Sequence, residues 1–132
     1  MPIHSTELSS SARYAELHTL MGFLTQQAEQ MGFSTADTLR FQLVLEELFS
    51  NTLEHGYGGE CDRPIHLAVR PRSGGLTLIY RDQAPAFDLT HVSASAPGEH
   101  QLGGQGINLI LGMALAIRYR RVAENNLTEL DL

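Results

Sequence analysis

Two short alternating segments joined by a glycine turn constrain the fold of this chain more than any other feature. Residues 64–71, PIHLAVRP, alternate apolar and polar side chains with the period of a half-buried strand, and a proline ends the segment. Residues 75–82, GLTLIYRD, repeat the alternation after a Ser-Gly-Gly turn, which predicts a hairpin. One side of this hairpin is apolar, so a second layer of structure must cover it.

Two segments with helical periodicity precede the hairpin and can supply this layer. Residues 9–31 start with serines suited to cap a helix, continue with apolar residues at helical spacing, and stop at Gly32. Ser34 opens a second helix, which runs to about His55 and ends at Gly56. The apolar stripe of the second helix consists of Phe41, Val44, Leu45, Leu48, Phe49 and Thr52. We expect this stripe to face the sheet.

The C-terminal part of the chain adds one helix and a second hairpin. Residues 82–103 are polar and rich in turn formers, and a short apolar helix follows over residues 104–114. Residues 114–122 form a strand, residues 124–126 a turn, and residues 127–132 a final strand. The economical packing is an α+β fold, a two-layer α/β sandwich whose mixed, mostly antiparallel sheet has helices on one face.

Composition bounds the class of protein and its environment. The 132 residues suit one domain, and no apolar run approaches the roughly 20 residues of a membrane span. The N-terminus lacks the basic and apolar regions of a secretory signal, so we expect a cytoplasmic protein that does not associate with membranes. Cys61 is the single cysteine, which excludes an intrachain disulfide.

All the basic residues are arginines, and this excludes several mechanisms. The chain has nine arginines, no lysine and a net charge of −6. Without lysine it has neither a Walker A phosphate clamp nor a Schiff-base amine. The arginines are scattered except for three between residues 118 and 121, so we expect no nucleic-acid partner.

The second predicted helix carries polar side chains in an apolar context. At about 100° per residue, Glu47, Asn51 and His55 lie on one ridge, whereas Glu46 lies on the opposite flank. A carboxylate and an amide oxygen one turn apart suit a hard cation such as Mg²⁺, and the carboxylate can also deprotonate a hydroxyl. The alternative is that Glu47 and Asn51 are solvated residues beside the core, with His55 only favouring the helix dipole.

Two later segments carry further candidate binding residues. Asp82 opens the sequence DQAPAFD directly after a strand, and its alternative role is that of a turn residue bonding its own backbone. Residues 102–111, LGGQGINLIL, bring glycines to a helix start, where free N–H groups favour phosphate; the alternative is a flexible loop. Because residues 82–103 contain no Lys or Arg, a phosphate here would rely on backbone amides and a metal.

The three motifs, in this order, resemble those of the GHKL ATPase superfamily, whose ATP-binding fold is the Bergerat fold. The ExxxN sequence of residues 47–51 resembles the N box, residues 82–88 the G1 box, and residues 103–110 the G2 box. Residues 55–57, His-Gly-Tyr, and the short chain look most like the RsbW-type anti-sigma-factor serine kinases. The sequence departs from the family in the G1 box, where Ala84 and Ala86 replace glycines.

This resemblance implies roles for individual residues, with residues 1–132 as a single histidine-kinase-like ATPase domain. Asn51 would ligate a Mg²⁺ that bridges the ATP phosphates, and Glu47 would act as general base or position the attacking group. Asp82 would accept a hydrogen bond from the adenine amino group. The remaining residues expected at the nucleotide are His55, Ala84, Phe87, Gly103, Gly104, Gly106 and Thr128.

The resemblance also implies a function and partners. The chain would be an ATP-dependent protein serine/threonine kinase and anti-sigma-like regulator that phosphorylates a serine of a STAS-domain anti-anti-sigma protein. It would hold a sigma factor or another regulatory target when that protein is phosphorylated, and the family is compatible with a homodimer. One alternative is a module that binds its partners, with or without ATP, and transfers no phosphate. Another is an ATPase that drives a conformational change, although this short domain has no transducer to move.

Overall fold

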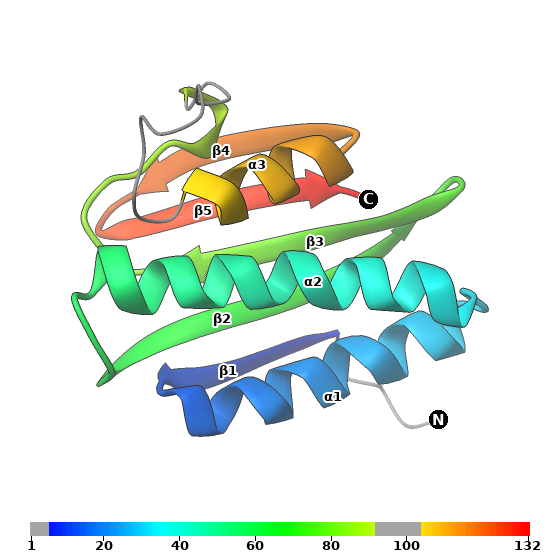
Figure 1. Cartoon of the computed structure of the whole chain (residues 1–132), viewed down its shortest axis with the longest axis horizontal. Helices are drawn as coiled ribbons and strands as arrows, with labels where there is room; N and C mark the ends of the chain where they lie inside the picture. Colours follow the sequence, from blue (N-terminus) through cyan, green and yellow to red (C-terminus); the bar gives the residue numbers. More distant parts are fainter. Residues whose placement is uncertain (1–5, 92–103) are drawn as a thin grey trace.

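The structure, a computed structural model, describes residues 6–91 and 104–132 and contains one sheet covered on one face by helices (Figure 1). The strands are β1 (Glu7–Ala12), β2 (Cys61–Arg72), β3 (Gly75–Asp82), β4 (Ala116–Val122) and β5 (Asn125–Asp131). The α-helices are α1 (Tyr14–Gln30), α2 (Thr35–Asn51) and α3 (Gly104–Met113), and the short helices are η1 (Thr52–Gly56) and η2 (Leu89–His91). The strand order is β1-β2-β3-β5-β4, and every described pairing is antiparallel. The predicted α+β sandwich is confirmed.

The core lies between the sheet and the helices, where the sequence patterns predict it. The apolar stripe of α2 is buried along its whole length, together with the alternating residues of β2 and β3. The largest side chains in this layer that are fully buried include Phe49, Leu45, Leu53, Ile65, Leu67 and Leu78. None of the described helices is long and apolar enough to span a membrane.

The first helix starts later than the sequence predicts. Residues 9–12 belong to the edge strand β1, which pairs with β2 from Glu7 opposite Ala68 onward, and α1 begins only at Tyr14. The serines suit a cap locally, but the outer edge of β2 offers unpaired backbone groups that β1 satisfies. The start of α1 is instead capped by a remote carboxylate, since the Tyr14 N–H donates to Glu60 Oε1 at 2.7 Å.

The second helix begins as predicted but changes its winding near the end. The Ser34 hydroxyl accepts a hydrogen bond from the Asp37 N–H at 3.1 Å, which confirms the predicted cap. The α-helical part stops at Asn51, and the chain continues to Gly56 as a π-helical turn. A hydrogen bond of 2.7 Å from the Tyr57 N–H to the Thr52 carbonyl closes this turn. Such turns are frequent at functional sites, and this one ends beside the candidate nucleotide residues.

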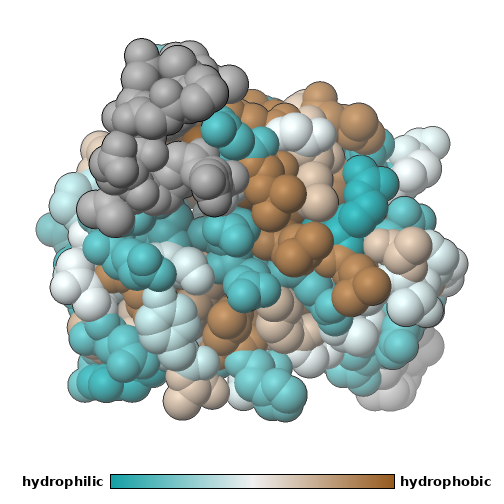
Figure 2. All heavy atoms as spheres, viewed as in Figure 1, coloured by the Kyte–Doolittle hydropathy of each residue, from teal (hydrophilic) through white to brown (hydrophobic). Residues whose placement is uncertain are grey.

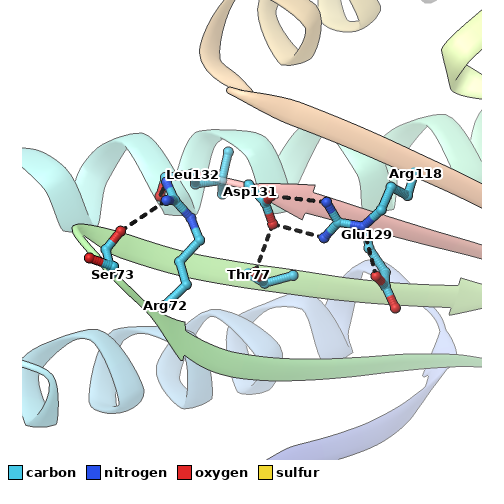
Figure 3. A network of polar contacts seen from close by, with 7 residues as sticks. All are labelled: Arg72, Ser73, Thr77, Arg118, Glu129, Asp131 and Leu132. Carbon is cyan, nitrogen blue, oxygen red and sulfur yellow. Dashed lines mark hydrogen bonds and ion pairs between the residues drawn. The ribbon is translucent and has the colours of Figure 1, made fainter.

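A polar network on the uncovered face of the sheet holds the edge strand β4 (Figure 3). The Arg118 guanidinium donates two hydrogen bonds to the Asp131 carboxylate, each at 2.9 Å, and a third to Glu129 at 3.1 Å. The Thr77 hydroxyl donates to the same Asp131 at 2.7 Å. Paired hydrogen bonds of this kind are the strong form of an ion pair, so three neighbouring strands are joined side chain to side chain.

This network predicts an acid-sensitive contribution to stability. The Arg118 guanidinium, followed by the Thr77 hydroxyl, holds the pKa of Asp131 well below its usual range. In the unfolded chain this pKa returns to roughly 3.9, so the contribution is complete above that pH and is lost as the pH falls further. We expect Asp131→Asn to lower the melting temperature by about 2–4 °C at pH 7, with a smaller difference from the wild type at pH 3.

The matched control for this change is Asp62→Asn, since Asp62 is paired with Arg13 but has 86% of its side chain exposed. Thermal unfolding of the three proteins followed by circular dichroism between pH 3 and pH 7 measures the effect. A loss for Asp131→Asn that stays constant over this range would show that the ion pair does not contribute through its charge.

Candidate functional site

The structure brings most of the predicted nucleotide residues to one cavity of about 190 Å³ beside the C-terminal end of α2. The lining comes from α2, η1, β3, β5, α3 and the segment of residues 84–89. The predicted residues that line it are Asn51, His55, Asp82, Ala84, Phe87 and Thr128. Residues far apart in the sequence therefore meet at one site, as the order of the motifs predicts.

The Asp82 carboxylate is buried in this cavity and has one acceptor position open. Its Oδ1 accepts hydrogen bonds from the Ala84 N–H at 3.1 Å and from the Asn126 amide at 2.9 Å. Its Oδ2 accepts one from the Thr52 hydroxyl at 2.9 Å. Because a carboxylate has about four lone-pair positions, the remaining one is on Oδ2. Asp82 bonds its own turn, as the alternative predicts, and still has this acceptor available for a ligand.

The direction of the hydrogen bonds around Thr52 follows from the number of protons. The Thr52 hydroxyl lies 3.0 Å from the Leu48 carbonyl, 2.7 Å from the Tyr80 hydroxyl and 2.9 Å from Asp82 Oδ2. It carries one proton, and the carboxylate is the strongest acceptor, so Thr52 donates to Asp82. The Tyr80 hydroxyl, which lies 2.7 Å from Thr52 Oγ1 and 3.3 Å from the Leu48 carbonyl, donates to the nearer oxygen. Burial raises the pKa of Tyr80 well above its ordinary value, so the phenol remains a donor.

Two residues that hold this site were missed by sequence reasoning. The sequence predicts a turn at Asn126, but β5 begins at Asn125, and the strand period puts Asn126 on the buried side with Thr128. Arg121 on β4 donates to the Ala84 carbonyl at 2.8 Å and to Asn126 Oδ1 at 3.1 Å. The alternation of residues 125–131 is the signal in the sequence that points to Asn126.

Ala84 and Gly56 meet in close contact at the wall of the cavity. A Cβ added to Gly56 would lie 2.8 Å from the Ala84 Cβ, which is closer than real Cβ atoms approach. The alanine that replaces a family glycine in the G1 box therefore fits because the residue opposite it has no side chain.

The predicted residues Glu47 and Gly106 do not line this cavity, but they contact each other one turn of α2 before Asn51, which does line it. A Cβ at Gly106, in the first turn of α3, would overlap the Glu47 carboxylate, so that carboxylate would have to move if residue 106 carried a side chain. Burial, followed by the charges of Glu46 and Glu54, raises the pKa of Glu47. Glu47 is partly buried and Glu46 exposed, as the ridge predicts. Gly104 begins α3, and Gly103 lies outside the described residues.

The remaining polar groups fit a cation that is brought in by phosphate. Neither the Glu47 carboxylate nor the Asn51 amide has a hydrogen-bond partner among the described residues, so their oxygens are available. The described residues contain no cluster of three or more His, Cys, Asp or Glu side chains suited to a metal. A Mg²⁺ ion would therefore take one or two ligands from the chain and the rest from phosphate and water.

Comparison with known proteins assigns the class to which this fold and site belong. Residues 10–132 match the histidine kinase-like ATPase domain, and the chain belongs to that family. The predicted relationship to the GHKL superfamily is thereby confirmed, and the family implies ATP binding. No curated protein matches the chain in sequence.

Two solved structures share the fold at low sequence identity. One contains the RsbU and RsbW domains of Rv1364c from Mycobacterium tuberculosis, with a TM-score of 0.63 and 14% identity. The match covers 96% of this chain and 32% of that chain, so this protein spans about a third of its length. The other is the SiaB–SiaC complex from Pseudomonas aeruginosa, with a TM-score of 0.66, 11% identity, and coverage of 96% and 88%. Both similarities establish a common fold.

The contact between Gly56 and Ala84 predicts a reciprocal pair of substitutions. Gly56→Ala should lower the free energy of unfolding by about 1–3 kcal/mol, because the new methyl group overlaps the Ala84 methyl group. Ala84→Gly in the same chain should restore most of this loss. Denaturant unfolding of the single and double variants measures the coupling between the two positions.

Gly22→Ala is the control for the Gly56 substitution, since Gly22 lies within α1 and a Cβ there meets nothing within 4 Å. That change should leave stability unchanged or raise it, because alanine favours a helix. Additive effects at positions 56 and 84 would contradict the close packing of these two residues.

Proposed function

We propose that this protein binds Mg-ATP in the cavity and transfers the γ-phosphate to a serine of a STAS-domain anti-anti-sigma protein. It would act in the cytoplasm as an anti-sigma-like regulator, holding a sigma factor or another target when that protein is phosphorylated. One observation carries the proposal. The buried acceptor of Asp82 and the Asn51 side chain line one cavity, and Glu47, one turn before Asn51 on α2, lies against Gly106 in the first turn of α3. Neither Glu47 nor Asn51 has a side-chain hydrogen-bond partner among the described residues.

The Asp82 end of the cavity supports recognition of adenine. All described hydrogen-bonding neighbours of this carboxylate donate to it, so a ligand that uses the open position on Oδ2 must donate as well. The exocyclic amino group of adenine is such a donor, whereas guanine has a carbonyl oxygen at that position. Leu48, Leu89 and Ile107 supply apolar surface against which a base can pack.

The α3 end of the site supports binding of the phosphates. The first turn of α3 contains Gly106, and free backbone N–H groups at a helix start attract anions. Asn51 would contribute its side-chain oxygen to the Mg²⁺ ion, which neutralises charge on the triphosphate when bound. The chain has no lysine to bind the phosphates. The start of α3, the metal ion and the backbone N–H groups would together take the place of a cationic side chain.

Glu47 would accept the proton of the serine hydroxyl. As the serine oxygen bonds to the γ-phosphorus, the bond from that phosphorus to the bridging oxygen breaks, and ADP leaves with the electron pair. A raised pKa makes Glu47 a stronger base than an ordinary carboxylate and brings it closer to the pH at which it must act. Positioning and charge neutralisation would supply the rest of the catalysis.

An apolar surface beside Glu47 supports a protein as the phosphate acceptor. Figure 2 shows apolar side chains gathered over α3 and its border with α2. Leu39 and Leu43 precede Glu47 by two turns and one turn of α2, and they are 54% and 41% exposed. Leu115, just after α3, is 74% exposed. Exposed leucines of this kind are typical of surfaces that bind another protein, and the SiaB neighbour was solved in a complex with SiaC.

The two adjacent glutamates provide a direct test of this mechanism. We expect Glu47→Gln to lower phosphate transfer at least 100-fold while the affinity for Mg-ATP stays within a few-fold, since the base is lost and the binding groups remain. Asn51→Ala should weaken Mg-ATP binding itself. Incubation with radiolabelled ATP and a STAS-domain protein encoded by a neighbouring gene measures transfer, and calorimetry measures affinity.

Glu46→Gln is the matched control, because Glu46 is exposed on the opposite flank of α2 and affects Glu47 only through its charge. It should leave Mg-ATP affinity unchanged and lower transfer far less than Glu47→Gln. A larger loss from Glu46→Gln than from Glu47→Gln would overturn the assignment of the base. Wild-type protein that binds the STAS partner and Mg-ATP but forms no phosphoserine would instead be a partner-binding module without transferase activity.

A further inference from the structure

We propose that Asn126 positions the Asp82 carboxylate and thereby sets the preference for a purine with an amino group over one with a carbonyl oxygen at the same place. This inference rests on the proposed nucleotide function and deepens it. It assigns a specificity role to a side chain outside the three motifs, on β5, the strand that neighbours β3. Asn126 is 5% exposed and lines the same cavity as Asp82.

The amide nitrogen of Asn126 meets three oxygens. It donates to Asp82 Oδ1 at 2.9 Å, to the Pro85 carbonyl at 3.1 Å and to the Ala84 carbonyl at 3.2 Å. The two N–H groups are therefore both used, one of them shared between two acceptors. The result is a direct link from β5 to the functional carboxylate and to the backbone that follows it.

The amide oxygen of Asn126 meets three donors on its other side. It accepts from the Phe87 N–H at 3.2 Å, the Tyr119 hydroxyl at 2.6 Å and the Arg121 guanidinium at 3.1 Å. Turning the amide by 180° would set its oxygen against three oxygens and its nitrogen against three donors. The partners therefore define a single orientation, in which the N–H groups point at Asp82.

This orientation determines how Asp82 can meet a ligand. Oδ1 is occupied by Asn126 and the Ala84 N–H, so the carboxylate cannot rotate without losing two hydrogen bonds. Oδ2, which accepts from Thr52, keeps the open position. An exocyclic amino group can donate to Oδ2, whereas a carbonyl oxygen at that place would set two acceptors against each other.

The composition of residues 84–87 explains why the loop depends on such a residue. Ala84, Pro85 and Ala86 contain no glycine, and Pro85 has no N–H group for a backbone turn. The carbonyls of Ala84 and Pro85 are anchored from outside the segment by Asn126, and that of Ala84 also by Arg121. Base recognition in this chain is thus held by the last hairpin.

Binding of Mg-ADP and Mg-IDP, measured by calorimetry, tests the inference, because inosine has a carbonyl oxygen where adenine has the amino group. Wild type should prefer Mg-ADP by at least about tenfold. Asn126→Ala releases Asp82 Oδ1 and should reduce the preference to within about threefold. Asn126→Asp keeps the size and the accepting oxygen but sets a second carboxylate against Oδ1, and it should have the same effect.

Asn125→Ala is the matched control, since Asn125 is the adjacent residue and, among the described residues, its side-chain amide bonds only the Val122 carbonyl in the turn, at 3.3 Å. It should keep the wild-type preference. If Asn126 had only a structural role, replacing it would weaken the binding of Mg-ADP and of Mg-IDP by the same factor. An unchanged ratio of the two affinities in Asn126→Asp therefore overturns the inference, even if Asn126→Ala fails to fold. Wild type that binds no Mg-ADP overturns the proposed function and this inference together, whereas binding with an unchanged ratio in the variants overturns the inference alone.

Discussion

The site depends on a carboxylate, Asp82, that is buried at the end of a central strand and surrounded by donors. Burying such a group without partners would be costly, so the chain commits Thr52, Asn126 and the Ala84 N–H to it. These donors come from η1, β5 and the segment after β3, which ties three parts of the chain to one position. Because one acceptor position remains open, the same contacts that stabilise the carboxylate also prepare it for a donating ligand.

The helix α2 connects the core to both ends of the site. One stripe of it packs on the sheet, and the neighbouring ridge brings Glu47 and Asn51 toward α3 and the cavity. The π-helical turn at its end leads to Gly56, which leaves room for the Ala84 methyl group. The methyl group of Ala84 is thus accommodated by the residue that faces it.

Much of the fold and part of the site could be predicted because they depend on patterns close in the sequence. Strand alternation and the stripe of α2 identify the core, and helical geometry alone separates Glu47 from Glu46. The strand β1 was missed because its serines indicate a cap, whereas its conformation depends on the edge of β2. Asn126 was missed because asparagines favour turns, whereas its place is decided by pairing between β5 and β3.

The sequence by itself determined the class of fold, the order of the three motifs and the edge of α2 that carries Glu47. It could do so because helix and strand periods are local properties of the chain. Three features were decided only by the tertiary structure. They are the oxygen of Asp82 that stays open, the accommodation of Ala84 by Gly56, and the anchoring of the Ala84 carbonyl by Asn126. These features depend on distances between segments separated by about 30 to 45 positions in the chain, which no local pattern records.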